Sequence, residues 1–131
     1  SGDARVHDVA ALDLDDDSGD VEICDVEGEV FVDDGSGDLR VERAGAVAVT
    51  DGSGELWITA TRGDVVVEDD SGELLVDGAD GDVDVTDASG GIVIRHVAGL
   101  VTVRDGSGDI DVSDVGGFEL LEDGSGEVSA P

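Results

Sequence analysis

Hydrophobic and polar residues alternate in short runs along this chain, and the runs return at a regular interval. Val21 and Ile23 alternate with polar residues in one run. After a glycine at position 28, Val30 and Val32 alternate in the same way. A period of two is typical of a β-strand with one buried face. The pattern in each unit therefore predicts a strand, a corner, a second strand and a second corner.

A Ser-Gly pair marks the same point in every unit, at intervals of 17 or 18 residues. The serines of these pairs are Ser1, Ser18, Ser36, Ser53, Ser71, Ser89, Ser107 and Ser125. A short fixed period indicates a repeat architecture in which stacked units supply the core. We therefore predict an all-β fold, a single parallel β-solenoid (β-helix) of about seven coils with two strands per coil. We expect it to be right-handed, as parallel crossovers overwhelmingly are.

Aliphatic residues occupy equivalent positions from coil to coil. The inward position that opens the first strand holds Ala4, Val21, Leu39, Leu56, Leu74, Ile92 and Ile110. Its counterpart in the second strand holds Leu12, Val30, Val47, Val65, Val83 and Val101. The seventh coil fits only if Phe118 and Leu120 point inward and one residue is added after them.

Glycines stand where the corners are expected. One follows each repeat serine, and another set, which includes Gly28, Gly63 and Gly99, marks the opposite corner. Tight corners need backbone with positive φ or close approach between coils, and glycine permits both. The serine beside it can bind the turn backbone. We therefore interpret these residues as structural.

The charge of the chain is strongly one-sided. Its 131 residues include 35 Asp and Glu against 6 Lys and Arg, for a formal charge of −29. The absence of a basic patch argues against nucleic acid and anionic membranes as partners. The 39% of hydrophobic residues recur in phase with the repeat, which argues against disorder. Self-repulsion of such a surface is screened only at high ionic strength, so we expect a salt-requiring fold.

The length and the remaining composition fit a single domain spanning residues 1–131. The single cysteine excludes an intramolecular disulfide, and no apolar run is long enough to span a membrane. Because the sequence has no methionine and begins at a repeat boundary, we expect an excised or processed part of a longer protein. A cell-surface or extracellular location is favoured, with the cytoplasm of a halophile as the alternative.

The repeated phrase Ser18-Gly19-Asp20-Val21, answered by Gly28-x-Val30-x-Val32, is similar to a known repeat type. It resembles a family of bacterial and archaeal β-helix domains named for a suggested adhesin role, and the resemblance covers essentially the whole chain. The resemblance implies a β-helix and a surface role but supplies no catalytic residues. A weaker likeness is to bactofilins, whose β-helical domains polymerise end to end.

Acidic residues flank the repeat serine on both sides, two positions before it and two positions after it, with Gly91 as the single break in the second set. The pattern Asp-x-Ser-x-Asp places oxygen ligands at alternate positions, as hard-cation loops do, so Ca²⁺ or monovalent cations are candidate ligands. The candidate metal-binding residues are Asp34, Ser36, Asp38, Asp51, Ser53, Glu55, Asp69, Asp105, Ser107 and Asp109. The alternative is a solvated, salt-screened corner whose carboxylates cap backbone amides.

Large apolar residues also occupy outward positions. Trp57, Leu75 and Val93 stand in consecutive coils on the first strand, and Phe31 and Val66 stand on the second. Such a strip on an acidic rod predicts a protein contact surface anchored by Trp57. The alternative is that these residues only favour strand formation.

No group of residues in the sequence predicts a catalytic site. His7 and His96 fall in distant coils, and Cys24 has no histidine in its own coil. No insertion is long enough to wall a cleft. We therefore predict a non-enzymatic, adhesin-like surface module of a halophilic organism without a cofactor. The alternatives are an end-to-end filament, formed by self-association of the solenoid ends, and a calcium-stabilised extracellular module.

Overall fold

The chain forms an all-β parallel solenoid of about 7 turns, seen in a computed structural model that describes residues 4–16, 18–124 and 126–129. The strands of one wall are β1 (Ala4–Val9), β3 (Val21–Val26), β5 (Leu39–Glu42), β7 (Glu55–Thr61) and β9 (Glu73–Ala79). Those of the other wall are β2 (Leu12–Asp16), β4 (Val30–Asp34), β6 (Val47–Asp51), β8 (Val65–Asp69) and β10 (Val83–Asp87). The long strands β11 (Ile92–Asp105) and β12 (Ile110–Asp123) run through both walls, and β13 (Val128–Ser129) follows.

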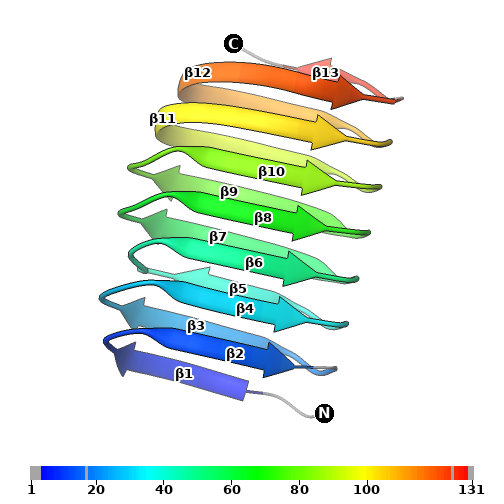
Figure 1. Cartoon of the computed structure of the whole chain (residues 1–131). Helices are drawn as coiled ribbons and strands as arrows, with labels where there is room; N and C mark the ends of the chain where they lie inside the picture. The colour runs from blue at the N-terminus through cyan, green and yellow to red at the C-terminus, as the bar shows by residue number, and fades with distance from the viewer. Residues whose placement is uncertain (1–3, 17, 125, 130–131) are drawn as a thin grey trace.

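Each strand pairs in parallel with its equivalents in the neighbouring coils, so the 13 strands form one continuous sheet wound around the core (Figure 1). The order along the sheet is β1-β3-β5-β7-β9-β11 on one side and β10-β8-β6-β4-β2 on the other, with β12 against β11 and β13. Register pairs Leu56 with Leu74 and Val47 with Val65, as the sequence columns require. The predicted parallel β-solenoid is confirmed.

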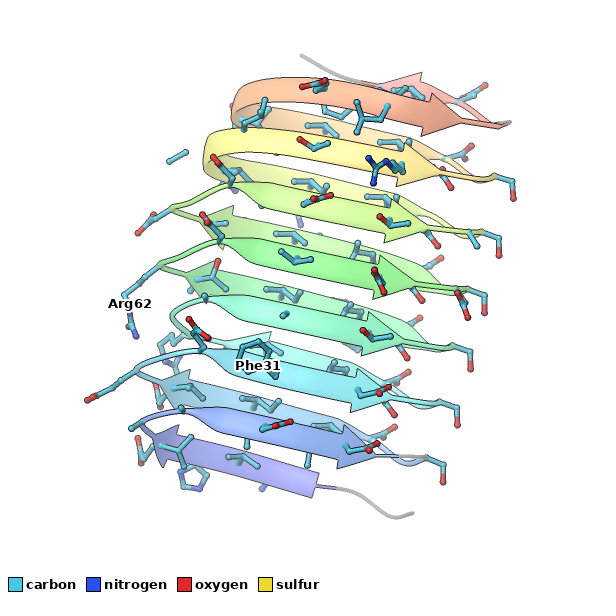
Figure 2. The ribbon with its side chains drawn as sticks, in the orientation of Figure 1. Phe31 and Arg62 are labelled. Atoms are coloured by element: carbon cyan, nitrogen blue, oxygen red, sulfur yellow. The ribbon has the colours of Figure 1, made fainter. Side chains whose placement is uncertain are left out.

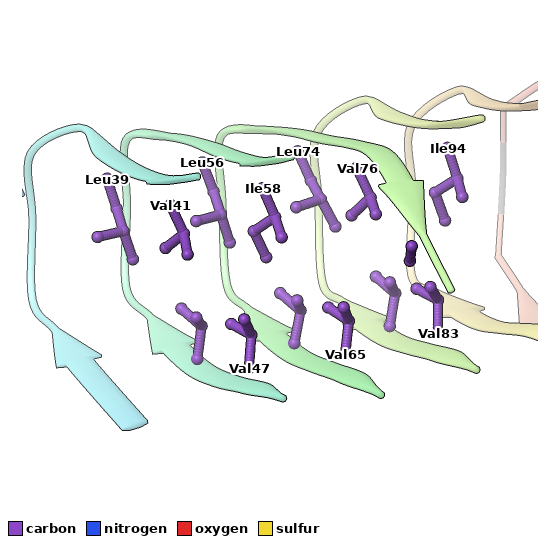
Figure 3. Packing of buried hydrophobic residues seen from close by; sticks show 14 of the residues in the cluster. Leu39, Val41, Val47, Leu56, Ile58, Val65, Leu74, Val76, Val83 and Ile94 are labelled. Carbon is purple, nitrogen blue, oxygen red and sulfur yellow. The ribbon is translucent and has the colours of Figure 1, made fainter. Parts of the chain in front are cut away.

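Branched aliphatic side chains from the two walls meet in the interior (Figure 3). Leu56 and Ile58 of β7 lie on one wall, and Val47 and Val65 lie on the facing wall. These side chains are buried because alternation turns every second residue of each strand inward. Each coil alone would leave one face of this core exposed, so stacking supplies the stability.

The seventh coil keeps the inward pattern by absorbing an irregularity. Val101 pairs with Phe118 and Val103 pairs with Leu120, and both new side chains pack partly buried against the core. A register shift follows, after which Arg104 pairs with Glu122. Leu121 is thus the added residue, and its side chain is exposed. The predicted inward positions of Phe118 and Leu120 are confirmed.

The two corners differ in backbone conformation, and each uses one of the two properties of glycine that the sequence indicated. At the Ser-Gly corner the glycines adopt positive φ, as expected. At the opposite corner, Gly28, Gly63 and Gly99 do not; the positive φ lies three residues earlier, on Asp25, Ala60 and His96. These glycines allow the predicted close approach between coils, since a Cβ on Gly28 would overlap the carbonyl oxygen of Ala10.

Candidate functional site

A strip of large side chains crosses the outer face of three neighbouring strands. Trp57 of β7 pairs with Leu75 of β9, and Leu75 pairs with Val93 of β11. Strand alternation places all three outward, and each is half-buried by its neighbours in the strip. The structure therefore brings the predicted first-strand contact residues together. We call Trp57, Leu75 and Val93 the Trp57 strip.

Arg40 borders the Trp57 strip, a neighbour that the sequence interpretation missed. Arg40 of β5 pairs with Trp57, and its guanidinium carbon lies 5.2 Å from the centroid of the indole ring. A cation at this distance over an aromatic face is attracted to it. The signal was present in the sequence, because Arg40 precedes Trp57 in the same outward column. Shallow depressions flank the indole, one lined by Arg40 and the other by Leu75 and Val93.

The second predicted group lies on the opposite wall. Phe31 of β4 projects away from the core (Figure 2) and is 48% exposed, while Val66 of β8 is 46% exposed. Ala48 of β6 pairs with both residues and separates them. Phe31 and Val66 therefore lie near each other, but they do not join the Trp57 strip. The two groups face opposite directions, so one flat partner surface would engage one group at a time.

The acidic position two residues before each repeat serine is buried. Register stacks these side chains coil on coil, and all are at most 3% exposed. They form what we call the inner acid column: Asp34, Asp51, Asp69, Asp87 and Asp105. The expectation of a solvated corner is thus wrong for these residues, because strand alternation continues to the last residue and turns it inward. The side chains of Asp16 and Asp123, at the same position in the sequence, lie outside the described part of the chain.

Burial alters the acidity of the inner acid column. Burial, followed by the charges of Asp69 and Asp34, raises the pKa of Asp51 to about 7. Burial likewise raises the pKa of Asp69 to about 6, although the amide of Ser71 lowers it in part. Burial and then the charges of Asp69 and Asp105 raise the pKa of Asp87 to about 7. A substantial fraction of these carboxyl groups is therefore protonated near pH 7.

The acidic position two residues after the repeat serine behaves differently at Asp20, Asp38 and Asp109, where the carboxylate accepts a hydrogen bond from a backbone amide of the next coil. The amide N–H of Glu55 donates to Asp38 Oδ1 at 3.3 Å, and that of Glu127 donates to Asp109 Oδ1 at 3.1 Å. This capping was part of the non-metal interpretation and is confirmed at these positions. Ser36, Ser53 and Ser107 are half-buried in the turns between the two acidic positions.

These carboxylates do not converge on a common centre. Within residues 4–16, 18–124 and 126–129, no three histidine, cysteine or carboxylate side chains are grouped so that they could hold a metal ion. Of the candidate ligands, Asp34, Asp51, Asp69 and Asp105 face the interior, whereas Asp38 and Asp109 engage amides. Calcium binding at these corners stays a prediction.

The nucleophilic and basic side chains take part in local pairs. His7 and Cys24 are register neighbours in adjacent coils, as their column predicted. Burial, with Glu22 and Glu42, raises the pKa of the Cys24 thiol, the opposite of what an activated thiol needs. His96 Nδ1 lies 2.7 Å from Asp77 Oδ1, and its Nε2 lies 3.4 Å from Asp114 Oδ2. These exposed pairs link neighbouring coils.

Arginines bind the corner that lies opposite the Ser-Gly turns. Arg62 extends along this corner (Figure 2) and donates from Nη2 to the carbonyl oxygens of Val26 and Glu27, both at 3.1 Å. Arg43 pairs with Asp25 of the preceding coil. Arg43 thus links adjacent coils and Arg62 reaches two coils back, at the corner that carries the non-glycine residues of positive φ.

Comparison with known proteins returned no matching family model, curated protein or solved structure. Among the described residues there is no helix of the length and apolarity that crossing a bilayer requires. The resemblance to adhesin-type domains and to bactofilins therefore stays a prediction.

Proposed function

We propose that this chain is a non-enzymatic, adhesin-like surface module of a halophilic organism. In this proposal it acts by binding another protein through the Trp57 strip. The observation that carries the proposal is the register of Trp57, Leu75 and Val93 across β7, β9 and β11. A rigid sheet holds these side chains in place, so little conformational entropy is lost on binding. Aromatic anchors beside an arginine are typical of energetically dominant contact residues.

The surrounding charges support a selective contact. Glu55, Glu73 and Arg95 line the depression beside Leu75, and Arg40 covers the other side of the indole. A partner would therefore meet an apolar centre with a charged rim, the usual anatomy of a protein interface. At high ionic strength the rim charges are screened and the apolar centre supplies most of the binding.

Adhesion of coated beads tests this function. Beads carrying the chain through a C-terminal tag are expected to attach, in molar KCl, to immobilised cell-envelope proteins. The double variant W57S/L75S is expected to reduce attachment about tenfold or more, since it removes the central anchor. The matched control L100S/L121S removes exposed apolar side chains elsewhere and is expected to attach like the wild type.

The outcome also separates the proposal from the alternative of self-assembly. Wild-type beads that attach no better than albumin-coated beads would contradict a contact function. If the molar mass of the soluble chain then rises with concentration in sedimentation runs, end-to-end assembly replaces it. Equal losses in W57S/L75S and L100S/L121S would show attachment without a defined site.

A further inference from the structure

The inner acid column places carboxyl groups in the buried interior of the fold. Asp51 is 1% exposed and Asp69 is 3% exposed, and register puts their Cα atoms opposite each other. Neighbouring parallel strands lie about 4.8 Å apart, so adjacent carboxyl groups lie within reach of a shared proton or ion. Ionised carboxylates stacked at this spacing in a poorly hydrated interior repel strongly.

Backbone amides of the turns compensate these charges only in part, because those of Ser53 and Gly52 lower the pKa of Asp51, and that of Ser71 lowers the pKa of Asp69, without cancelling the effect of burial. Neither oxygen of Asp51 or Asp69, nor Oδ2 of Asp87, has a hydrogen-bond partner of normal geometry in the part of the chain described. The amide of Ser89 donates to Asp87 Oδ1 at 3.1 Å. Buried polar atoms without a partner are rare in native folds, so an ionised carboxylate is costly at these positions and the neutral acid is favoured.

The arrangement suits a proton better than a metal ion. Ca²⁺ takes 6–8 oxygen ligands, but the column offers neighbouring carboxyl groups in a line. No group of three acidic side chains among the described residues could hold a metal ion. A proton needs only two oxygens: one carboxyl group binds it and donates the O–H to the neighbouring carboxylate.

We infer that the inner acid column binds protons from solution as the coils stack, and that neighbouring carboxyl groups share them, so that the solenoid loosens when the column ionises. Each step adds one proton to a carboxylate oxygen, giving a neutral carboxylic acid that donates to the next coil. Ionisation releases the proton to solvent and leaves repelling charges between coils. The fold thereby carries a pH-sensitive element that lies apart from the Trp57 strip.

Most of the groups around the column are acidic or apolar, and the one basic neighbour in the described part of the chain is exposed Arg104 at the rim. Asp34 and Asp69 act on Asp51, Asp70 acts on Asp69, and Asp69 and Asp105 act on Asp87. Glu68 and the exposed Arg104 line the outer rim beside Asp69, Asp87 and Asp105. Among described residues, Thr61 is the only other buried polar side chain, and the rest of the core is hydrophobic. No buried cation in this set can neutralise the column.

The direction of the pH effect follows from the raised pKa values. Between the ordinary carboxyl pKa of 3.8 and about 7, the folded chain binds more protons than the unfolded chain. The stabilisation is complete below 3.8 and is lost as the pH rises through about 6 to 7. Stability is therefore expected to fall between pH 5 and pH 8.

The test compares the melting temperature at pH 5 and pH 8 in molar KCl. For the wild type, we expect a decrease on the order of 10 °C at pH 8. The triple variant D51N/D69N/D87N should lose most of this decrease and melt above the wild type at pH 8. The control D33N/E68Q/D84N removes the same formal charge from outward positions of β4, β8 and β10, and it should keep the wild-type decrease.

Two outcomes would overturn the inference. A triple variant with the wild-type pH dependence would show that these carboxyl groups do not control it. The second outcome concerns cations, with tetramethylammonium at matched ionic strength as the control. If potassium or calcium restores the melting temperature of the wild type at pH 8, but not that of the triple variant, a cation is the ligand. Should the triple variant not fold, ¹³Cγ NMR titration of the wild type decides. We expect midpoints of about 6 to 7 for Asp51, Asp69 and Asp87, and midpoints near 3.8 would contradict the inference.

Discussion

Replacing Gly90 with alanine is expected to destabilise the solenoid by about 3 kcal/mol or more. Gly90 has φ +120°, a conformation that residues with a side chain rarely adopt. In addition, a Cβ at this position would overlap the carbonyl oxygen of Gly72 in the preceding coil. That carbonyl belongs to the stacked backbone and cannot move without shifting a whole coil. Urea unfolding in molar KCl, followed by circular dichroism, measures the loss.

The adjacent residue provides the control for Gly90→Ala. Gly91 has no positive φ in the left-handed region, and the atom nearest to an added Cβ is the carbonyl oxygen of Asp109 at 4.0 Å. Gly91→Ala is therefore expected to be neutral or to stabilise by about 0.4–1 kcal/mol, because it restricts the unfolded chain. Similar losses for the two substitutions would mean that the coils do not stack as described.

Leu74→Ala is expected to cost about 2–5 kcal/mol, the range for removing a large aliphatic side chain from a packed core. Leu74 is 1% exposed and lies between Leu56 and Ile92 in the inward column. The neighbouring coils are fixed by their own hydrogen bonds, so the cavity cannot close completely. The same urea titration measures the change in midpoint.

Leu75 is the matched control, since it has the same side chain one position later on the outward face. Leu75→Ala is expected to change stability by less than about 1 kcal/mol, because the half-buried side chain loses only contacts within the Trp57 strip. A larger loss for Leu75→Ala than for Leu74→Ala would reverse the inward and outward assignment of the whole wall.

The sequence predicted the solenoid because its signals are periodic and agree from coil to coil. Leu56 and Leu74 occupy the same phase of the repeat, and the structure pairs them directly. The outward position of Trp57 followed from the same alternation. In the irregular seventh coil, the sequence indicated inward positions for Phe118 and Leu120, and both pack against the core, but the place of the added residue came only from the structure.

The buried position of the inner acid column was not predicted, although the alternation contains it. Val47, Val49 and Asp51 follow each other at every second residue, so Asp51 must point inward with the valines. The usual cost of burying a carboxylate favoured a solvated interpretation. The corner conformation was also missed, because positive φ on Asp25 or His96 leaves no sign in a glycine pattern. These positions depend on backbone closure of the whole coil.

The outward carboxylates and the buried carboxyl groups are compensated in different ways. The outward carboxylates lie in water, where dissolved salt screens their repulsion. The inner acid column is shielded from that salt, and protons neutralise it instead under our inference. Salt and pH should therefore act on stability through separate groups, Glu68 and Asp84 representing the first and Asp51 the second.

The most direct test of a salt-screened structural module is thermal unfolding by far-UV circular dichroism in dilute buffer and in KCl raised to molar levels. Parallel samples contain millimolar CaCl₂, MgCl₂ or a chelator. We predict that molar KCl alone gives a cooperative β-sheet transition and that the chelator leaves it unchanged. Folding by millimolar calcium, where matched magnesium or potassium has no effect, would contradict this account and identify the Asp-x-Ser-x-Asp corners as calcium ligands.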